Sequence, residues 1–262
     1  MNTIHDTVFI TGASSGIGAA LAKRFAAQGA VLGLVARRGD ALEKLCASLP
    51  HAERHRIYAL DVNDHAALAA AAADFIQVHG KVNVVIANAG ISIGTLTEYQ
   101  DDLPVFADVV QTNLLATAAT FSPFISHMRE HASEHAYRLV GIGSVAGIRG
   151  LPGAGAYSAS KAAVISYCES LRVELSSTRI KVVTIVPGYI DTPMTEVNSY
   201  AMPFLMPVDD FAGKAVAAIK AGVSYKVIPW QMGGVAKLLR LLPNWLYDLV
   251  FARAPHKSRA AK

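Results

Sequence analysis

The sequence predicts an α/β protein with a single doubly wound parallel sheet of about seven strands and with helices on both faces. Seven short apolar runs, rich in β-branched residues, alternate with longer alanine-rich stretches along the chain. The runs lack the polar alternation of a half-exposed strand, so we expect strands buried on both faces, as in a parallel sheet covered by helices. No linker rich in proline, glycine or serine interrupts the alternation, which indicates one domain.

The expected strands cover residues 7–11, 31–35, 56–60, 82–87, 137–143, 181–186 and 225–229. The expected helices cover residues 17–28, 41–49, 66–79, 103–125, 157–175 and 209–220. In a doubly wound sheet, ligands bind beyond the carboxyl ends of the strands. The candidate functional motifs of the chain come directly after strands, so we expect these motifs to meet at that edge.

Composition and charge exclude several classes of protein. A content of 52% hydrophobic and 17% charged residues indicates an extensive core and argues against disorder. The net charge is +4, but the residues from Lys237 onward carry +5 and the rest of the chain sums to −1. The body has no basic stripe with interleaved aromatic residues, so we expect no nucleic-acid partner.

Two cysteines and the chain's first residues bear on the cellular compartment. Cys46 and Cys168 lie far apart and lack metal-ligand spacing, so we expect reduced, structural thiols and no metal site. The polar stretch of residues 1–6 does not resemble a signal peptide, and no apolar run is long enough to span a membrane. A cytoplasmic protein is expected.

A glycine-rich loop, "TGASSGIG", comes after the first expected strand and opens a helix. Gly12, Gly16 and Gly18 allow a sharp turn and let the backbone approach a pyrophosphate, whose charge is stabilised by N–H groups at the helix N-terminus. Glycines alone would also suit a tight βα turn. The strand before, the helix after and an apolar Ile17 favour a Rossmann-type dinucleotide site.

The second expected strand ends in "LVARRGD", where an NAD site usually carries a carboxylate. Arg37 and Arg38 stand there instead, and two guanidinium groups suit the 2′-phosphate of NADP(H). The alternative is that both arginines are solvated at the start of a helix. Asp61, after the third strand, would accept a hydrogen bond from an adenine amino group or place a charge at a helix N-terminus.

Tyr157 and Lys161 in "YSASK" are four residues apart, so they share one face of the expected helix. A nearby ammonium lowers the pKa of a phenol from about 10 towards neutrality, as a general acid/base requires. Ser144, at the end of the fifth strand, lies on the same ligand-binding edge and would bind the same substrate oxygen. Tyr–Lys pairs are also common on helix surfaces, which is the alternative.

Taken together, the motifs resemble the short-chain dehydrogenase/reductases over residues 5–230. The motifs that carry the resemblance are "TGASSGIG", "ANAG" (87–90), Asn113, Ser144, "YSASK" and "PGYIDTPM" (187–194). One departure is Ala87, where many relatives carry asparagine. The resemblance implies a homodimer or homotetramer and hydride transfer between NADP(H) and a carbonyl or alcohol carbon.

The resemblance also implies catalytic roles. Tyr157 would donate the proton in reduction and act as the base in oxidation, and Ser144 would polarise the carbonyl. Lys161 would hold the nicotinamide ribose and lower the pKa of Tyr157. Asn113 would hold a water that links Lys161 to solvent.

The cofactor site implied by the resemblance extends along the whole strand edge. Residues 88–90 would line its adenosine side, and Thr192 would contact the nicotinamide through its backbone amide. The expected cofactor-binding residues are Gly12, Ser14, Ser15, Gly16, Ile17, Gly18, Arg37, Arg38, Asp61, Val62, Asn88, Ala89, Gly90, Tyr157, Lys161, Pro187, Gly188, Ile190 and Thr192.

We expect the catalytic domain over residues 1–234, with a lid at about 193–212, and an amphipathic basic extension over 235–262. The lid is apolar and methionine-rich and contains no arginine or lysine, which favours a hydrophobic carbonyl substrate. Packing on the core or on a second subunit is the alternative for its apolar residues. These are Val197, Tyr200, Met202, Phe204, Leu205 and Met206.

The extension carries apolar residues at helical spacing beside basic ones. We expect it either to cover the lid or a subunit face, or to lie in a membrane interface with Trp245 and Tyr247 at headgroup depth. Its apolar residues are Leu238, Leu242, Trp245, Leu246, Leu249 and Val250. Two helices rich in small residues would form the subunit interface. The small residues are Ala116, Ala118, Ala119, Ala156, Ala159, Ser160 and Ala163.

Three readings of function remain open on the sequence. The first is an NADP(H)-dependent reductase of a hydrophobic carbonyl compound or dehydrogenase of its alcohol. The second is a reductase of 3-oxoacyl thioesters on a carrier protein or coenzyme A. The third is a protein that senses NADP(H) or acts as a membrane-surface scaffold without catalysis.

Overall fold

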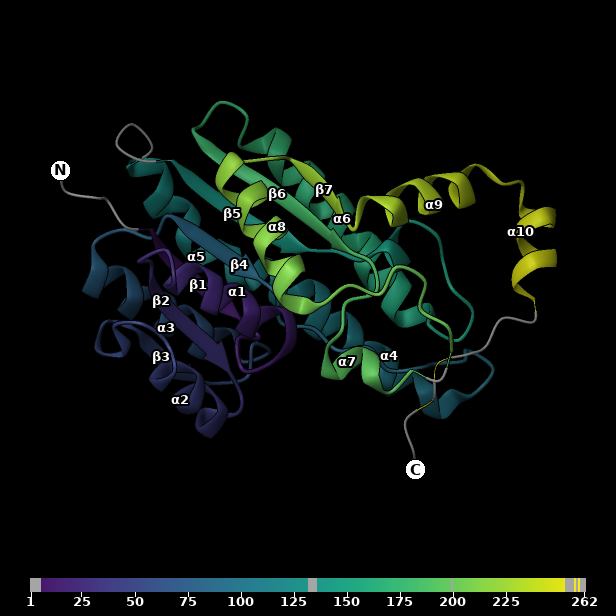
Figure 1. Cartoon of the computed structure of the whole chain (residues 1–262), viewed down its shortest axis with the longest axis horizontal. Helices are drawn as coiled ribbons and strands as arrows, with labels where there is room; N and C mark the ends of the chain where they lie inside the picture. The colour runs from purple at the N-terminus through teal and green to yellow at the C-terminus, as the bar shows by residue number, and fades with distance from the viewer. Residues whose placement is uncertain (1–5, 132–135, 199, 253–256, 258, 260–262) are drawn as a thin grey trace.

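A computed structural model describes residues 6–131, 136–198, 200–252, 257 and 259, and these form one parallel seven-stranded sheet with the order β3-β2-β1-β4-β5-β6-β7 (Figure 1). The strands are β1 (Thr7–Thr11), β2 (Val31–Ala36), β3 (Arg56–Ala59), β4 (Val84–Ala87), β5 (Tyr137–Ile142), β6 (Ile180–Pro187) and β7 (Tyr225–Ile228). The order reverses between β1 and β4, so the predicted doubly wound sheet is confirmed.

The helices cover both faces of the sheet. They are α1 (Gly16–Ala26), α2 (Gly39–Ala47), α3 (His65–His79), α4 (Leu103–Val110), α5 (Ala116–Glu130), α6 (Gly155–Glu174), α7 (Pro193–Glu196), α8 (Val208–Ala221), α9 (Trp230–Leu241) and α10 (Asn244–Phe251). Alternate strand residues point to opposite faces. Val8 and Ile10 therefore pack under α1, α2 and α8, whereas Phe9 packs with Phe75 and Phe124 under α3 and α5.

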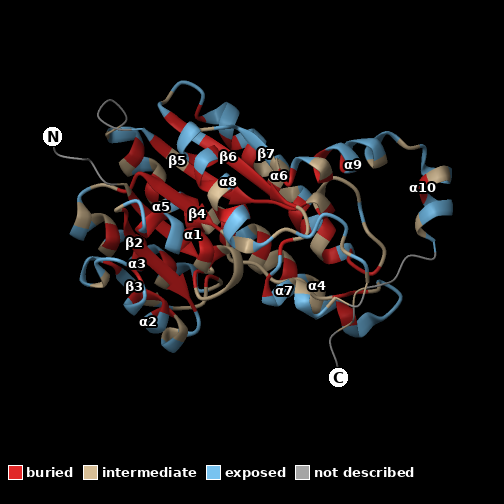
Figure 2. Cartoon of the chain, in the orientation of Figure 1, coloured by how far each residue is buried: buried red, intermediate tan, exposed pale blue. Residues whose placement is uncertain are grey.

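The two edge strands depart from the expectation of burial on both faces. The five inner strands are almost entirely buried, as the red sheet in Figure 2 shows, but β3 and β7 have exposed and half-buried residues. An edge strand has a neighbour on one side only, and no helix covers its outer border. Lys226 and Arg56 accordingly lie at the surface.

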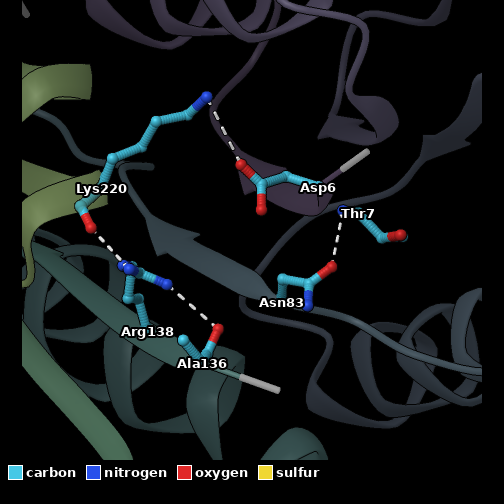
Figure 3. Close-up of polar contacts among 6 residues, drawn as sticks. All are labelled: Asp6, Thr7, Asn83, Ala136, Arg138 and Lys220. Carbon is cyan, nitrogen blue, oxygen red and sulfur yellow. Dashed lines mark hydrogen bonds and ion pairs between the residues drawn. The ribbon is translucent and has the colours of Figure 1, made fainter. Parts of the chain in front are cut away.

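The amino ends of the strands are joined by polar contacts, on the side opposite the motifs (Figure 3). Asn83 Oδ1 accepts a hydrogen bond from the backbone N–H of Thr7 at 3.0 Å and so joins the starts of β4 and β1. Arg138 of β5 donates to the backbone carbonyls of Ala136 and Lys220, and Lys220 Nζ lies 3.6 Å from Asp6. These contacts connect α8 to the sheet at the amino ends of the strands. The carboxyl ends, where ligands bind in a doubly wound sheet, lie on the opposite side.

The long helix expected over residues 103–125 is interrupted. It consists of α4, a π-helical turn over Gln111–Leu115 and then α5. A π-turn inserts one residue into a helix and rotates the part of the helix beyond it, and such turns are frequent at functional sites. Asn113 lies in this turn and is fully buried.

The expected subunit-interface residues do not form one exposed surface. Ala116, Ala156 and Ser160 are buried within the chain itself, because α6 packs against α4 and the π-turn. The remaining small residues of that set are half-buried or exposed. Assembly through these helices stays a prediction that would rest on Ala118, Ala119, Ala159 and Ala163.

The C-terminal extension forms two helices, and the first of them crosses the expected boundary between residues 234 and 235. Pro243 ends α9 and starts α10, so the single apolar stripe expected from the spacing is broken at Leu242. Among the described residues, no helix has both the length and the apolar content to cross a bilayer.

Candidate active site

The motif residues meet around one cavity of about 600 Å³ at the carboxyl ends of the strands. All but two of the residues that the sequence singled out for cofactor binding or catalysis line it. The two exceptions are Gly18, which packs beneath the glycine loop, and Asn113, which lies behind the wall. The cavity is also lined by residues that were not among the expected cofactor-binding or catalytic residues: Ala36, Leu60, Asn63, Ile91, Asp108, Thr112, Ile142, Gly143, Pro193, Met194 and Thr195.

The glycine loop lies tightly against the end of β4. Gly12 has φ +67°, and a Cβ atom placed there would lie 2.8 Å from Ala89 Cα. A Cβ on Gly18 would lie 2.2 Å from the carbonyl oxygen of Gly12. Any side chain at these positions would move the loop away from the cavity, so the two glycines are required by close approach of the backbone.

Thr11 joins the glycine loop to β4 and was missed by the sequence reasoning. Its Oγ1 accepts hydrogen bonds from the backbone N–H groups of Asn88 and Ala89, at 3.1 and 3.2 Å. The side-chain amide of Asn88 in turn donates hydrogen bonds to the backbone carbonyls of Thr11 and Gly12, at 3.0 and 3.2 Å. A threonine at a strand end carries no distinctive pattern, so only the pairing of β1 with β4 reveals this function.

Arg37 and Arg38 both line the cavity, but they have different partners. Arg38 Nη2 donates to the hydroxyl groups of Ser14 and Ser15, at 3.1 and 3.0 Å, and so reaches from the end of β2 to the glycine loop. Arg37 Nη1 lies 3.7 Å from Asp61 Oδ2. Two positive charges thus stand beside the loop, one of them partly balanced by a carboxylate.

Asp61 also stabilises the turn in which it lies. Its Oδ1 accepts a hydrogen bond from the backbone N–H of Asn63 at 3.0 Å, which shapes the loop after β3. Asp64 rather than Asp61 caps α3, accepting from the N–H of Ala67 at 3.0 Å. The sequence analysis expected Asp61 either to accept from an adenine amino group or to place a charge at a helix N-terminus. The residue that caps the helix is Asp64.

Ser144, Tyr157 and Lys161 come together at the cavity wall. Ser144 comes after β5, close enough to Tyr157 to influence the pKa of the phenol, and its hydroxyl accepts a hydrogen bond from the N–H of Ala146 at 3.2 Å. Lys161 lies one helical turn from Tyr157 on α6, and its Nζ donates to the carbonyl of Ile142 at 2.8 Å. The alternative of a solvated helix-surface pair is wrong, because Lys161 is buried.

The structure corrects the expected direction of the Tyr157 pKa. Burial raises the pKa of Tyr157 above its usual value, and the nearby Ser144 hydroxyl opposes this rise. The Lys161 ammonium lies 5.9 Å from the centre of the tyrosine ring and is bonded to a backbone carbonyl instead of the phenol. Burial in turn lowers the pKa of Lys161 to about 8.

Asn113 holds the segment after β4 against α6. Its Oδ1 accepts from the N–H of Ile91 at 2.8 Å, and its Nδ2 donates to the carbonyl of Ile91 and to Ser160 Oγ at 3.0 and 2.9 Å. Ser160 Oγ in turn donates to the carbonyl of Tyr157 at 2.8 Å. The side-chain amide is therefore engaged by protein groups, and the expected water-holding role stays a prediction.

Thr192 lines the cavity, but its backbone amide has a partner within the chain. The amide N–H donates to Thr195 Oγ1 at 3.1 Å, within a capping box at the start of α7. The expected contact of this N–H with a nicotinamide stays a prediction, and it would compete with the bond to Thr195. The Thr192 hydroxyl, which donates to the carbonyl of Ile190 at 3.3 Å, also belongs to the turn.

The lid residues have mixed environments. Val197, Phe204 and Leu205 are exposed, whereas Met206 packs on the core below α8. The Tyr200 ring lies 6.3 Å from that of Tyr189, and its pKa is raised by burial and by the nearby Tyr189 and Tyr157. The lid segment therefore brings a second phenol near Tyr157.

The end of the described chain returns to the segment after β4, which the sequence reasoning did not foresee. Lys257 Nζ donates to Ser92 Oγ at 2.8 Å, and Arg259 binds the carboxylate of Asp102. Ser92 is two residues from Gly90, which lines the cavity. The lid contains no basic residue, but the extension places Lys257 and Arg259 beside the segment after β4.

The arrangement fits a nicotinamide dinucleotide. Gly16 and Ile17 place the N-terminus of α1 at the cavity, where the first N–H groups of a helix have no partner within the helix and attract phosphate. The close contact of Gly12 with Ala89 leaves backbone rather than side chains to meet the ligand. Tyr157, Lys161 and Gly188 also line the cavity, where the resemblance places the reacting ring.

Comparison with known proteins gives relatives across nearly the whole chain. The family model for short chain dehydrogenases matches residues 6–202. An uncharacterized oxidoreductase of Myxococcus xanthus is 35% identical over 256 residues, which are 95% of this chain and 97% of that protein. Another, from Mycobacterium tuberculosis, is 38% identical over 245 residues, which are 90% of this chain and 93% of that protein.

A solved structure has the same fold. It is the 3-ketoacyl-(acyl-carrier-protein) reductase of Brucella melitensis in complex with NADH, with a TM-score of 0.77 and 27% identity, covering 85% of this chain and 94% of that one. The match of the family model and the full-length relatives agree with the geometry of the cavity. The chain therefore belongs to the short-chain dehydrogenase family of oxidoreductases, which act on CH–OH and C=O groups.

Proposed function

We propose that the protein is an NADP(H)-dependent oxidoreductase that interconverts a carbonyl and a secondary alcohol on a hydrophobic small molecule. The observation that carries the proposal is the meeting of Ser144, Tyr157 and Lys161 at the wall of the cavity that the glycine loop also lines. A hydroxyl, a phenol and an ammonium at one strand edge suit proton transfer to and from a substrate oxygen.

The cofactor, when bound, supplies or accepts the hydride. Ser144 and Tyr157 donate hydrogen bonds to the substrate oxygen and stabilise the charge that develops on it. Burial raises the pKa of Tyr157 further above neutrality, so the phenol carries the proton that it gives in the direction of reduction. In oxidation, Tyr157 accepts the proton, and the positive charge of Lys161 favours the phenolate that this step requires.

Replacement of Tyr157 by phenylalanine tests the catalytic assignment. Tyr157→Phe keeps the ring that fills the wall and removes the exchangeable proton. We expect kcat to fall by about 10²–10⁴-fold while the dissociation constant of the dinucleotide, measured by fluorescence, changes little. Tyr189→Phe is a matched control on the lid side. Wild-type turnover by the Tyr157→Phe protein with any accepted carbonyl compound would overturn the assignment.

The preference for NADP(H) rests on Arg38 and Arg37. Arg38 is held on the glycine loop by Ser14 and Ser15 through one of its nitrogens, and a guanidinium has five N–H donors, so it can bind a phosphate as well. Arg37 brings a second charge to the same side of the cavity. The NADH complex of the Brucella protein is the reason to test this preference directly.

Arg38→Gln should lower kcat/KM for NADPH by about 10–100-fold, which is the loss of one charge-assisted contact, and leave kcat/KM for NADH nearly unchanged. Arg37→Gln should act in the same direction but less strongly, because Arg37 already faces Asp61. Lys44→Gln, at an exposed position of α2 outside the cavity, is the control. Equal losses of kcat/KM with NADPH and NADH would show that the arginines do not bind the 2′-phosphate.

A second candidate is a reductase of 3-oxoacyl thioesters, favoured by the likeness to the Brucella 3-ketoacyl reductase. The two candidates differ in the group attached to the carbonyl. Oxidation of NADPH with 3-oxoacyl thioesters, free ketones, aldehydes and steroids of matched apolar size separates them by kcat/KM. A preference for the thioester by tenfold or more would favour the second candidate.

A further inference from the structure

The outward face of α9 is apolar. Trp230, Leu238 and Leu241 are 74%, 63% and 81% exposed, and Val235 is exposed beside them. At 100° per residue, Trp230, Leu238 and Leu241 fall within one quarter of the helix circumference. This is the reverse of the usual surface helix, whose apolar stripe faces the core.

The opposite face of α9 is fixed to the body by small and flexible residues. A Cβ atom on Gly188, which lines the cavity, would lie 2.7 Å from Met232 Cγ, and one on Gly233 would lie 3.1 Å from Val227 Cβ. Ala236 is also buried. The inner face therefore packs at close distance, and the orientation of α9, with its large apolar side chains outward, is determined by these contacts.

The second helix, α10, is oriented in the same way. Tyr247 points inward, donates to the carbonyl of Gly150 and lies under the guanidinium of Arg149, 4.1 Å from the ring centre. Arg149 also donates to Asn244 Oδ1 at 3.1 Å. With Tyr247 held inward, Trp245, Leu249 and Val250 remain exposed (Figure 2, where much of α10 is pale blue).

These residues define what we call the α9–α10 surface: Trp230, Val235, Leu238, Leu241, Trp245, Leu249 and Val250, all exposed. Both tryptophans of the chain belong to it. In Figure 1, α9 and α10 extend from one end of the molecule, beyond the sheet and its covering helices. Exposed apolar side chains that are gathered on two consecutive helices, instead of scattered singly, indicate an interaction site.

The charges beside the surface decide between its occupants. Lys237 and Arg240 of α9 are exposed, and Asp248 is the one acidic residue of the two helices. A second copy placed on this surface would bring like charges together, with two cations and one acid on each side. A bilayer with anionic headgroups instead offers a partner for both cations.

We propose that the α9–α10 surface docks on the interface of a membrane that contains anionic lipid. Helices of 12 and 8 residues are too short to cross a bilayer but can lie in its interface, with their apolar side chains in the acyl boundary. Tryptophan prefers this depth because its ring is apolar and its N–H is polar. Tyr247, in contrast, takes no part, because it is held against Gly150.

Docking would place the cavity close to the lipid. Gly188 of the cavity wall packs on Met232 at the base of the surface, and Gly150, which accepts from Tyr247, belongs to the loop between Ser144 and α6. An apolar substrate dissolved in the bilayer would then have a short path to the lid. The docking itself does not depend on the proposed activity and is measured separately from it.

The test is flotation of the full chain with vesicles of phosphatidylcholine alone and of phosphatidylcholine with phosphatidylglycerol. We expect flotation with the anionic vesicles and a blue shift of tryptophan emission, because both tryptophans enter the interface. The triple variant L238Q/L241Q/L249Q keeps the helix-forming tendency of each position. It should bind the anionic vesicles about two orders of magnitude more weakly.

Two further variants separate charge from apolar contact. K237Q/R240Q should lose about fivefold in affinity for anionic vesicles for each charge removed. V173Q, at an exposed apolar position of α6, should bind like the wild type. Dinucleotide binding by each variant shows that the fold is kept.

Three results would overturn the proposal. The first is that the wild type does not float with anionic vesicles. The second is that the triple variant floats as well as the wild type. The third is that sedimentation velocity without lipid shows a dimer that the triple variant loses while no emission shift occurs with vesicles, since the surface would then belong to a second copy.

Discussion

The guanidinium of Arg259 binds both carboxylate oxygens of Asp102, with Nε 2.9 Å from Oδ2 and Nη2 2.8 Å from Oδ1. The same guanidinium lies 3.7 Å from the centre of the Tyr99 ring. Asp102 Oδ2 also accepts from the N–H of Leu96 at 2.8 Å. The end of the described chain is thereby joined to the segment between β4 and α4, which borders the active site.

This relationship predicts different costs for its two partners. Asp102→Ala removes the contact with Arg259 and also leaves the Leu96 N–H without its acceptor, so we expect the free energy of unfolding to fall by about 1–3 kcal/mol. Arg259→Gln should lower the free energy of unfolding by a smaller amount, because Asp102 still accepts the hydrogen bond from the N–H of Leu96. Arg172→Gln, at an exposed position of α6, is the control. Equal losses in the first two variants would contradict this ranking.

The fold was largely predictable because its strands are buried in the sheet. The run at residues 7–11 coincides with β1, and the other expected strands differ from the observed ones by no more than two residues at either end. Burial on both faces makes a strand uniformly apolar, and that signal is local. The edge strands β3 and β7 were misjudged, because exposure depends on sheet order, which no single segment reveals.

The π-turn at Gln111–Leu115 and the break at Pro243 show what periodicity does not detect. A π-turn adds one residue to a helix without any fixed residue pattern, so 103–125 was read as a single helix. Pro243 was a visible signal for a helix boundary, and it divides the stripe of the extension into two differently placed faces. Tyr247 points inward, whereas the sequence analysis expected it to lie at headgroup depth together with Trp245.

The site was predictable where its residues form linear motifs. The glycine loop and the Tyr157–Lys161 pair were found because their spacing has a local physical reason. Thr11 and Ser160 were not, because each acts through a partner far away in the sequence, Asn88 and Asn113 respectively. The pKa of Tyr157 could not be predicted either, since it depends on burial by segments from several strands.

Two glycines with equal backbone strain allow a controlled test of the loop. Gly12 and Gly80 both have φ +67°, but a Cβ atom meets Ala89 at 2.8 Å in the first case and nothing within 4 Å in the second. Alanine at either position therefore costs about 1–2 kcal/mol of strain in the left-handed region. Gly12→Ala should also weaken dinucleotide binding by tenfold or more, since the loop must move off β4, whereas Gly80→Ala should not. Equal affinities, measured by titration calorimetry, would show that the contact with Ala89 is unimportant.

The amide of Asn113 offers a further comparison. Asn113→Ala leaves the N–H and the carbonyl of the half-buried Ile91 backbone without their side-chain partners, so we expect a loss of about 1–3 kcal/mol in the free energy of unfolding. Ser160→Ala removes only one acceptor of the Asn113 amide, and about 1 kcal/mol is expected. Urea unfolding of both variants measures the difference. A Ser160→Ala protein as unstable as Asn113→Ala would place the critical contact on α6 instead of Ile91.

The buried ammonium of Lys161 makes the stability of the protein depend on pH. Burial lowers the pKa of Lys161 from 10.5 to about 8, so below pH 8 the folded and unfolded states are both protonated and the full cost of burying the charge is present. Between about pH 8 and pH 10 the unfolded state binds more protons, and the free energy of unfolding must rise with pH. The pKa of Tyr157, raised by burial, has the opposite effect, but only above its usual value of 10.

We therefore expect the free energy of unfolding to increase by on the order of 2 kcal/mol between pH 7 and pH 10 relative to Lys161→Met, which has a side chain of similar length and no charge. Urea unfolding at the two pH values, in both proteins, isolates the contribution of Lys161 from that of all other groups. Lys161→Met should also be inactive, because it lacks the positive charge that favours the phenolate of Tyr157. Parallel pH dependence in the two proteins would mean that the ammonium keeps a normal pKa, and hence that its burial at Ile142 costs nothing.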